Sequence, residues 1–162
     1  MYSAAWVTLK NNIVFIIAQS GGRGSVADHD AFSTHMDFPP EGVKLGAAVR
    51  QALEASRFLD YETMDVNKIR KFMYEEAQER DKVFLKQAMQ LTGTKTEGSF
   101  NRGSKACSID RVDDQFVIKP TMDGRGSWGK HQPTEDDMRY FPVGASDEEI
   151  QTAVIEALER SK

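Results

Sequence analysis

The sequence has a single cysteine, Cys107, so no intramolecular disulfide can form, and this usage is compatible with a reducing cytosol. A catalytic thiol needs a neighbouring base that activates it, and no such base stands out along the chain. We therefore expect Cys107 to be a buried structural thiol rather than a nucleophile.

Long apolar runs are also missing. The run at residues 13–18 is far shorter than the ~20 residues that cross a membrane, so it predicts a buried strand. The N-terminus has no basic segment followed by an apolar core and a cleavage site. The cytoplasm is therefore the expected location, and no membrane contact is predicted.

The chain has no excess of positive charge. Its 25 acidic and 21 basic residues give a net charge of −4, which argues against a nucleic-acid binder that works by neutralising phosphates, although a local basic patch stays open. The length of 162 residues fits one domain, and 40% hydrophobic with 28% charged residues is typical of a folded soluble protein. We expect a single domain over residues 1–162.

Two hairpins are predicted from alternating apolar segments. Residues 4–9 and 13–19 are rich in β-branched and aromatic residues, and the asparagines between them tolerate left-handed backbone geometry. Residues 108–109 and 115–119 form a second pair of strands around two aspartates. Pro120 ends the second strand of this pair, because proline cannot donate a backbone hydrogen bond. A further strand at 140–143 contains a proline, which is typical of a sheet edge.

Helical periodicity marks the other elements. Apolar residues recur at helical spacing over 44–58, and again from 66 to 91. Within the second region, residues 75–81 favour helix but lack large apolar side chains, so they are either a bend or a projecting, solvated turn. A short helix is expected between 96 and 103. The last helix has the clearest start, because Ser146 and Glu149 form a capping box.

These elements predict an α/β (α+β) protein in which a mainly antiparallel sheet packs against helices. The segment 20–42 between them is polar and is expected to be irregular. Its glycine-rich start lacks the Gly-Lys-Ser/Thr ending of a phosphate-binding loop, so phosphate binding is disfavoured.

Metal and catalytic sites are not predicted. His29 and His35 lie among aspartates in the irregular segment, without the paired helical spacing of a metal site, and solvated polar residues are the better interpretation. His131 likewise has no partner at an informative spacing. We therefore expect no catalytic residue, no metal ligand and no cofactor.

Several short motifs follow one another in an order that points to a known family. They are the turn at 20–24, Leu45-Gly46-Ala47-Ala48 with residues 52–57, residues 93–96, Cys107-Ser108-Ile109, Trp128, Phe141-Pro142, and Ser146 to Ile150. Together they span about residues 13 to 158. In this order the chain resembles the CdiI immunity proteins of bacterial contact-dependent growth inhibition systems.

The resemblance implies a function in binding. Such a protein resides in the cytosol and binds the C-terminal toxin domain of a CdiA-type surface effector that a neighbouring cell delivers. The toxins are commonly nucleases of DNA or transfer RNA, and inhibition is stoichiometric occlusion without catalysis or a cofactor. Strand addition at an exposed sheet edge is one contact mode of the family. The implied fold is Whirly-like, which is similar to a class of single-stranded nucleic-acid-binding proteins.

A nuclease cleft is basic, so acidic and aromatic surface residues are the candidate contacts with the toxin. The acidic candidates form two clusters: Glu75, Glu76, Glu79 and Asp81, and Glu135, Asp136 and Asp137. The aromatic candidates are Tyr61 and Tyr140, with Phe100 and Trp128 also considered; Trp6 and Trp128 are expected in the core. Either acidic run can instead simply solvate an exposed face.

Two rival functions stay open. A single-stranded nucleic-acid-binding module needs a basic strip with stacking aromatics, and the sequence offers two short basic groups: Lys68, Arg70 and Lys71, and Lys95, Arg102 and Lys105. A small hydrolase or transferase needs a convergent set of acid, base or nucleophile. No direct contact with nucleic acid is expected under the family interpretation.

Overall fold

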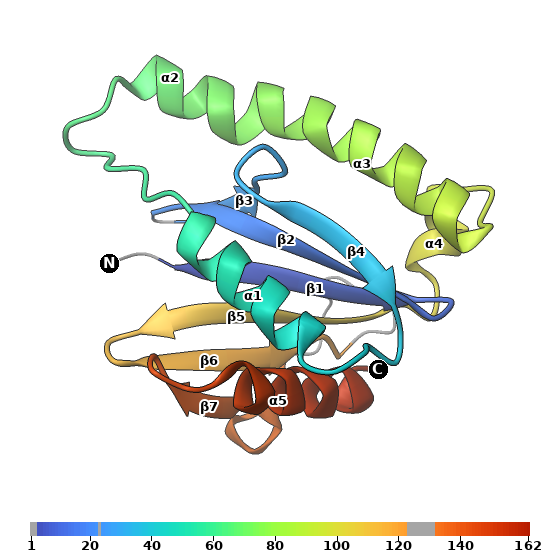
Figure 1. Cartoon of the computed structure of the whole chain (residues 1–162). Coiled ribbons are helices and arrows are strands. Elements are labelled where there is room, and N and C mark those ends of the chain that lie inside the picture. Colours follow the sequence, from blue (N-terminus) through green and yellow to red (C-terminus); the bar gives the residue numbers. More distant parts are fainter. Residues whose placement is uncertain (1–2, 23, 123–131) are drawn as a thin grey trace.

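The computed structural model describes residues 3–22, 24–122 and 132–162, and one sheet runs through them (Figure 1). The strands are β1 (Ala4–Lys10), β2 (Ile13–Gly21), β3 (Ser25–Ala27), β4 (Ser33–Asp37), β5 (Lys105–Val112), β6 (Gln115–Pro120) and β7 (Arg139–Pro142). The order is β3-β2-β1-β5-β6-β7, β4 also pairs with β2, and all pairs are antiparallel. The predicted α+β class and antiparallel sheet are confirmed.

Helices cover both faces of this sheet. They are α1 (Lys44–Ala55), α2 (Val66–Arg70), a π-helical turn η1 (Lys71–Glu76), α3 (Ala77–Thr92), α4 (Glu97–Asn101), a short 3-10 turn η2 (Glu135–Asp137) and α5 (Asp147–Arg160). In Figure 1, α1 and α5 lie against the sheet together, whereas α2, η1 and α3 form one long rod near β3 and β4. Within the described residues, no helix is long and apolar enough to cross a membrane.

The alternation of side chains along β2 divides the protein into two packing layers. Val14, Ile16 and Ala18 point into the main core, which α1 and α5 close, and all three are fully buried. Phe15 points to the opposite face, where it packs with Ala88 of α3 and with Phe100 in a smaller cluster. The rod is therefore held to the sheet by far less apolar surface than α1 and α5.

Both predicted hairpins are present. Asn11 and Asn12 take positive φ angles of 48° and 61° between β1 and β2, and Asp113 takes 55° between β5 and β6. Asparagine and aspartate adopt this left-handed geometry more readily than other residues with a side chain, so the turn residues set the register. The predicted edge strand near residue 140 is also confirmed as β7.

The predicted capping box at the start of α5 is confirmed. The Ser146 hydroxyl accepts a hydrogen bond from the Glu149 backbone N–H, and the Ser146 backbone N–H donates to the Glu149 carboxylate. The helix then crosses α1 very closely at Gly46, where an added Cβ would lie 1.8 Å from the Asp147 carbonyl oxygen. Only glycine permits this approach, so Gly46 fixes how α1 and α5 pack.

Two expectations about local structure were wrong. The polar segment 20–42 is not irregular, because it contains β3 and β4, and His35 lies on β4. Residues 75–81 form neither a bend nor a turn, because they continue the rod through η1 into α3. The wider π turn, which has more residues than an α turn, keeps Ile69, Ala77 and Ala88 on one buried face.

Candidate functional site

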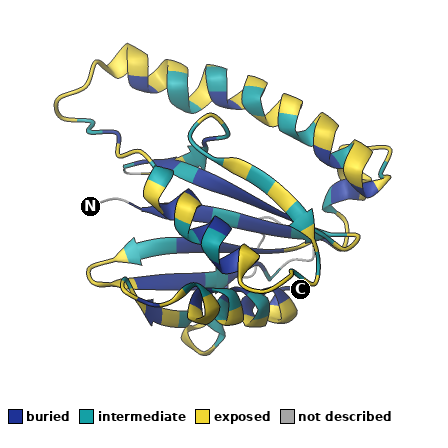
Figure 2. Cartoon of the chain, viewed as in Figure 1, coloured by how far each residue is buried: buried dark blue, intermediate teal, exposed yellow. Residues whose placement is uncertain are grey.

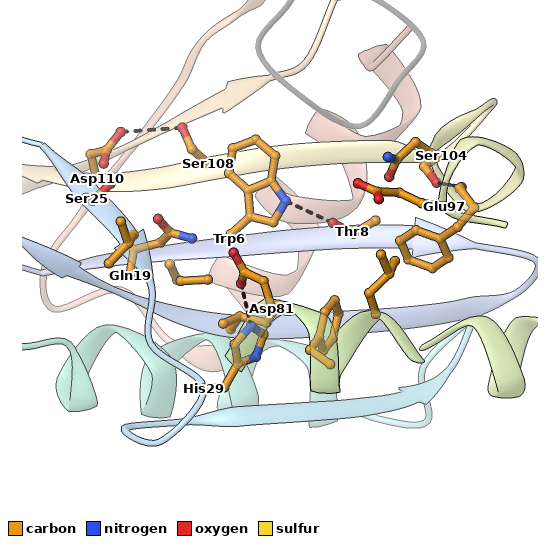
Figure 3. Close-up of a pocket in the computed structure, with 18 residues that line it drawn as sticks. Trp6, Thr8, Gln19, Ser25, His29, Asp81, Glu97, Ser104, Ser108 and Asp110 are labelled. Carbon is orange, nitrogen blue, oxygen red and sulfur yellow. Dashed lines mark hydrogen bonds and ion pairs between the residues drawn. The ribbon is translucent and has the colours of Figure 1, made fainter. Parts of the chain in front are cut away.

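A groove of about 510 Å³ lies between α3 and the sheet (Figure 3). Trp6 and Thr8 of β1 form its floor, and the Trp6 indole N–H donates a hydrogen bond of 2.9 Å to the Thr8 hydroxyl. Trp6 is only partly buried, so its expected place in the core is wrong. It sits on the face opposite the main core because it alternates with Ala5 and Val7.

His29 and Asp81 join the two walls of this groove. His29 Nε2 lies 3.1 Å from Asp81 Oδ1, and the imidazole stacks on Phe84 with ring centroids 4.6 Å apart. His29 Nδ1 also lies 3.4 Å from the Ser33 hydroxyl, which is near the outer limit for a hydrogen bond. His29 was expected to be solvated, and instead it tethers the turn between β3 and β4 to α3.

A buried carboxylate anchors the same turn. Asp28 is fully buried and accepts two hydrogen bonds of 2.7 Å from the Arg57 guanidinium and one of 2.6 Å from the Ser20 hydroxyl. Burial alone would raise the pKa of Asp28, but the hydrogen bonds from Arg57 and Ser20 and the Arg57 charge hold that pKa below its ordinary value. The carboxylate stays ionised and connects β3–β4 to the segment after α1.

Two guanidinium groups lie over the Phe72 ring. Arg57 is 5.0 Å and Arg80 4.6 Å from the ring centroid, distances that are typical of cation–π contacts. Arg80 also lies 3.6 Å from Asp30 and 3.7 Å from Glu76, while its Nε is buried without a hydrogen-bond partner among the described residues. These contacts hold η1 and α3 against the turn at Asp28.

The first predicted acidic cluster lies on this rod and is largely paired within the protein. Glu76 faces Lys71 and Arg80, Glu79 pairs with Lys82, and Asp81 binds His29. Among the described residues, Glu75 is exposed and makes no ion pair. Because residues 66–92 carry four acidic and six basic side chains, the rod as a whole is not an acidic surface.

The second predicted acidic cluster lies at the other side of the sheet, on η2 before β7. Glu135 accepts a hydrogen bond of 2.6 Å from the Tyr140 hydroxyl, and Asp137 caps η2 through Thr134. The Asp136 side chain is exposed and has no partner among the described residues. Figure 1 places this turn beneath β7 and α5, far from α3, so the structure does not bring the two predicted clusters together.

The aromatic candidates differ in accessibility. Tyr140 is 47% exposed, which suits a contact residue, and Tyr61 is half-buried beside Gly22. Phe100 is only 4% exposed and belongs to the cluster under α3, so it is not available as a surface anchor. Trp128 and His131 lie outside the described residues.

Strands β3 and β4 lie at one edge of the sheet and β7 at the other, and β4 and β7 differ in the backbone hydrogen-bonding groups that they leave free. On β4, alternate residues bond to β2, so Ser33, His35 and Asp37 direct their backbone N–H and C=O groups outward. No described strand pairs with that edge, and its alternating exposure is visible in Figure 2. On β7 the outward residues are Tyr140 and Pro142, and proline has no N–H to donate. The β4 edge is therefore the more open one.

The described residues offer little sign of metal or thiol chemistry. No group of three or more histidine, cysteine, aspartate or glutamate side chains is placed to hold a metal ion in the described ranges. Cys107 is fully buried on β5, as predicted, and burial raises the pKa of its thiol to about 12. At neutral pH the thiol is therefore protonated and poorly nucleophilic.

Comparison with known proteins adds the family. A family model described as CDI immunity protein (CdiI) matches residues 3–161. A protein of unknown function from Neisseria meningitidis has the same fold, with a TM-score of 0.84 and 20% identity over 100% of this chain and 96% of that chain. The CdiA-CT/CdiI toxin and immunity complex from Yersinia pseudotuberculosis contains a similar chain, with a TM-score of 0.82 and 22% identity over 100% and 98%. No curated protein matches the chain.

Proposed function

The chain belongs to the CDI immunity protein family, and from this membership we propose that it binds the C-terminal toxin domain of its cognate CdiA-type effector and neutralises it by forming a one-to-one complex. The observation that carries the proposal is the family match, because it covers residues 3–161 and so includes every described strand and helix. The fold shared with the Yersinia pseudotuberculosis toxin and immunity complex supports it.

Neutralisation by binding needs no chemistry from the inhibitor, and we propose none. His29 is the described histidine with the most polar contacts. Its Nε2 pairs with the Asp81 carboxylate, which is 59% exposed, and its Nδ1 lies 3.4 Å from the Ser33 hydroxyl. A general base works from a position that is shielded and close to the reacting group. The arrangement is better suited to fastening α3 than to activating a nucleophile.

The toxin is proposed to be a nuclease of DNA or transfer RNA. A nuclease holds a polyanion in a basic cleft, and an inhibitor that covers this cleft gains from acidic surface groups. The net charge of −4 supports this proposal. The predicted contact residues are the acids Glu75, Glu76, Glu79 and Asp81 on the rod, the acids Glu135, Asp136 and Asp137 on η2, and the tyrosines Tyr61 and Tyr140. Of these, the η2 residues and Tyr140 are the less engaged in structural ion pairs.

Strand addition at a sheet edge stays a prediction from the family resemblance. The β4 edge is the better candidate for it, because three of its residues have outward backbone groups. Replacing His35 by proline removes an outward donor but no bond to β2, whereas proline at Thr34 removes a bond within the sheet. If a toxin strand adds here, H35P weakens binding more than H35A does, while T34P unfolds the edge.

The proposed function is tested by co-expressing this chain with the toxin domain encoded beside its gene. We expect the cells to survive and the two proteins to co-purify in equal amounts. A variant with the main core broken, Val49→Asp, serves as the control for folding, because Val49 is fully buried. Death of cells that contain abundant, folded protein, with no complex formed, would refute the proposal.

The alternative of a single-stranded nucleic-acid-binding module receives less support. Lys71 of its first basic group lies 3.6 Å from Glu76, and the groove under α3 is lined by the carboxylates of Asp81, Glu97 and Asp110. Such a groove repels a phosphate backbone. Tight and salt-sensitive binding of a single-stranded oligonucleotide would restore this alternative.

A further inference from the structure

A second groove, of about 530 Å³, runs between the edge strand β7 and the outer side of α5. Its apolar part is formed by Phe141, Pro142 and Ala153, and the half-exposed Tyr140 stands beside them. Glu148, Glu149 and Glu156 line the helix side of the groove. The groove therefore combines a small apolar floor, an accessible aromatic ring and carboxylates, which is the composition of a protein-binding surface that has a centre and a charged rim.

The charge of the protein is concentrated around this groove. Residues 132–162 contain eight acidic and three basic side chains, which gives −5, although the whole chain carries only −4. The rest of the protein is thus close to neutral or slightly positive. Helix α5 packs against β7, and Arg160 of α5 donates a hydrogen bond to the Asp136 backbone carbonyl of η2, so the segments that carry these acids lie together in the lower part of Figure 1.

Several of these carboxylates are free to meet a partner. The side chains of Asp136, Glu148 and Glu159 are exposed and make no hydrogen bond or ion pair with the described residues. Glu156 is shared with Arg139 at 3.3 Å, and Glu149 is used in the cap of α5. The two arginines of this region are likewise occupied, since Arg139 and Arg160 both donate to the Asp136 backbone carbonyl.

We propose that this acidic face, formed by η2, β7 and α5, is where the toxin docks, and that it receives the basic surface with which a nuclease toxin holds nucleic acid. The proposal rests on the proposed function and specifies its interface. Charge complementarity selects the occupant, because a region of −5 attracts a cationic protein surface and repels nucleic acids and other acidic proteins. Tyr140 fills the centre of the contact, and the unpaired carboxylates surround it.

Docking at this face places the inhibitor in competition with nucleic acid for the basic surface of the toxin. Long-range attraction between opposite charges raises the association rate, which falls as salt screens it. The lifetime of the complex depends instead on the desolvated contacts, here those of the Tyr140 ring and of the apolar groove floor. Charge changes at the rim should therefore alter the association rate, and truncation of Tyr140 the dissociation rate.

The experiment measures association and dissociation rates of the cognate toxin domain with three forms of the full chain at several salt concentrations. The first is wild type. The second combines D136N, E148Q and E159Q. The third combines E54Q, E62Q and E97Q, which gives the same net charge from exposed acids that belong neither to this face nor to the other predicted contact residues. Circular dichroism checks that all three forms fold equally.

We expect the variant of the acidic face to associate at least about tenfold more slowly at low salt, and its association rate to depend less on salt. Electrostatic steering raises association rates by about tenfold or more, and this variant loses three of the charges that provide it. The control should stay within about twofold of wild type, since its charges lie outside the face. Y140A should speed dissociation, whereas Y140F, which keeps the ring, should not.

Equal losses in the two charge variants would show that only net charge matters and would overturn the proposal. So would full binding by the variant of the acidic face with loss of binding in H35P, because the toxin would then sit on β4. Failure of wild type to bind would instead contradict the proposed function. A DNA or RNA oligonucleotide that competes with wild type for the toxin supports docking on the nucleic-acid-binding surface.

Discussion

The buried carboxylate of Asp28 gives the sharpest prediction about stability. In the variant D28N the side chain keeps its size but loses its charge, and its amide can accept only one of the two hydrogen bonds of 2.7 Å that Arg57 donates. Removing one partner of a buried ion pair costs about 3–5 kcal/mol. The Arg57 side chain is 51% exposed and regains water, which lowers the cost. We expect a loss of about 2–3 kcal/mol at pH 7.

The effect should depend on pH in a defined direction. Because the pKa of Asp28 is lower in the folded state than its ordinary value of 3.8, the ionised carboxylate adds stability above the pKa of the unfolded chain. That contribution is lost as the pH falls through this value and then through the lower folded pKa. The difference between wild type and D28N should therefore be full at pH 7 and shrink below about pH 4.

Urea unfolding, followed by circular dichroism at pH 7 and at steps down to pH 3, measures this difference. The matched control is D30N, because Asp30 is 70% exposed and lies 3.6 Å from Arg80, so its loss should cost less than about 0.5 kcal/mol. A D28N variant whose free energy of unfolding lies within about 1 kcal/mol of wild type at pH 7, or a difference that is the same at every pH, would contradict this prediction.

Three further predictions test the core and the caps. G46A should lose more than about 2 kcal/mol in urea unfolding, because its Cβ would overlap the Asp147 carbonyl oxygen, whereas G144A, whose Cβ has open space, should change little. Cys107 should react with a thiol reagent at pH 8 only after unfolding, and fast labelling of folded protein would contradict its burial. S146A should cost about 1 kcal/mol by removing the cap of α5, and an unchanged midpoint would show that the cap contributes nothing.

The parts of the fold that follow local rules were predictable from the sequence. Asparagine and aspartate pairs marked both hairpins, because few other residues accept positive φ. The capping box marked the start of α5, because its two hydrogen bonds involve residues three positions apart. Burial of Cys107 followed from residue type alone.

Elements that depend on distant partners were not predictable in the same way. Strand β4 has no apolar run, since its residues Ser33–Asp37 are alternately exposed at the rim of the sheet, and β2 supplies the pairing that makes it a strand. The rod was predicted wrongly at 75–81 because a π turn shifts the helical period by about one residue, which interrupts the α-helical pattern of apolar residues. Trp6 lies in a groove because α3, about 80 residues later in the chain, lies across the groove from Trp6 and leaves its side chain partly exposed.

The candidate site shows why a run of charges in a sequence is a poor guide to charge on a surface. In α3 and η1, cations recur three to five residues from each acid, so the helix brings them together and the run neutralises itself. The run at Glu135–Asp137 has one such neighbour, Arg139, whose guanidinium bonds to Glu156 and to backbone carbonyls rather than to the carboxylates of the run. Strand β7 follows this run and pairs antiparallel with β6, and the chain then continues into α5. The outer side of α5 adds Glu148, Glu156 and Glu159 to the same region of the protein. The topology of the sheet therefore decides which of two similar acidic runs becomes a surface that attracts a basic toxin.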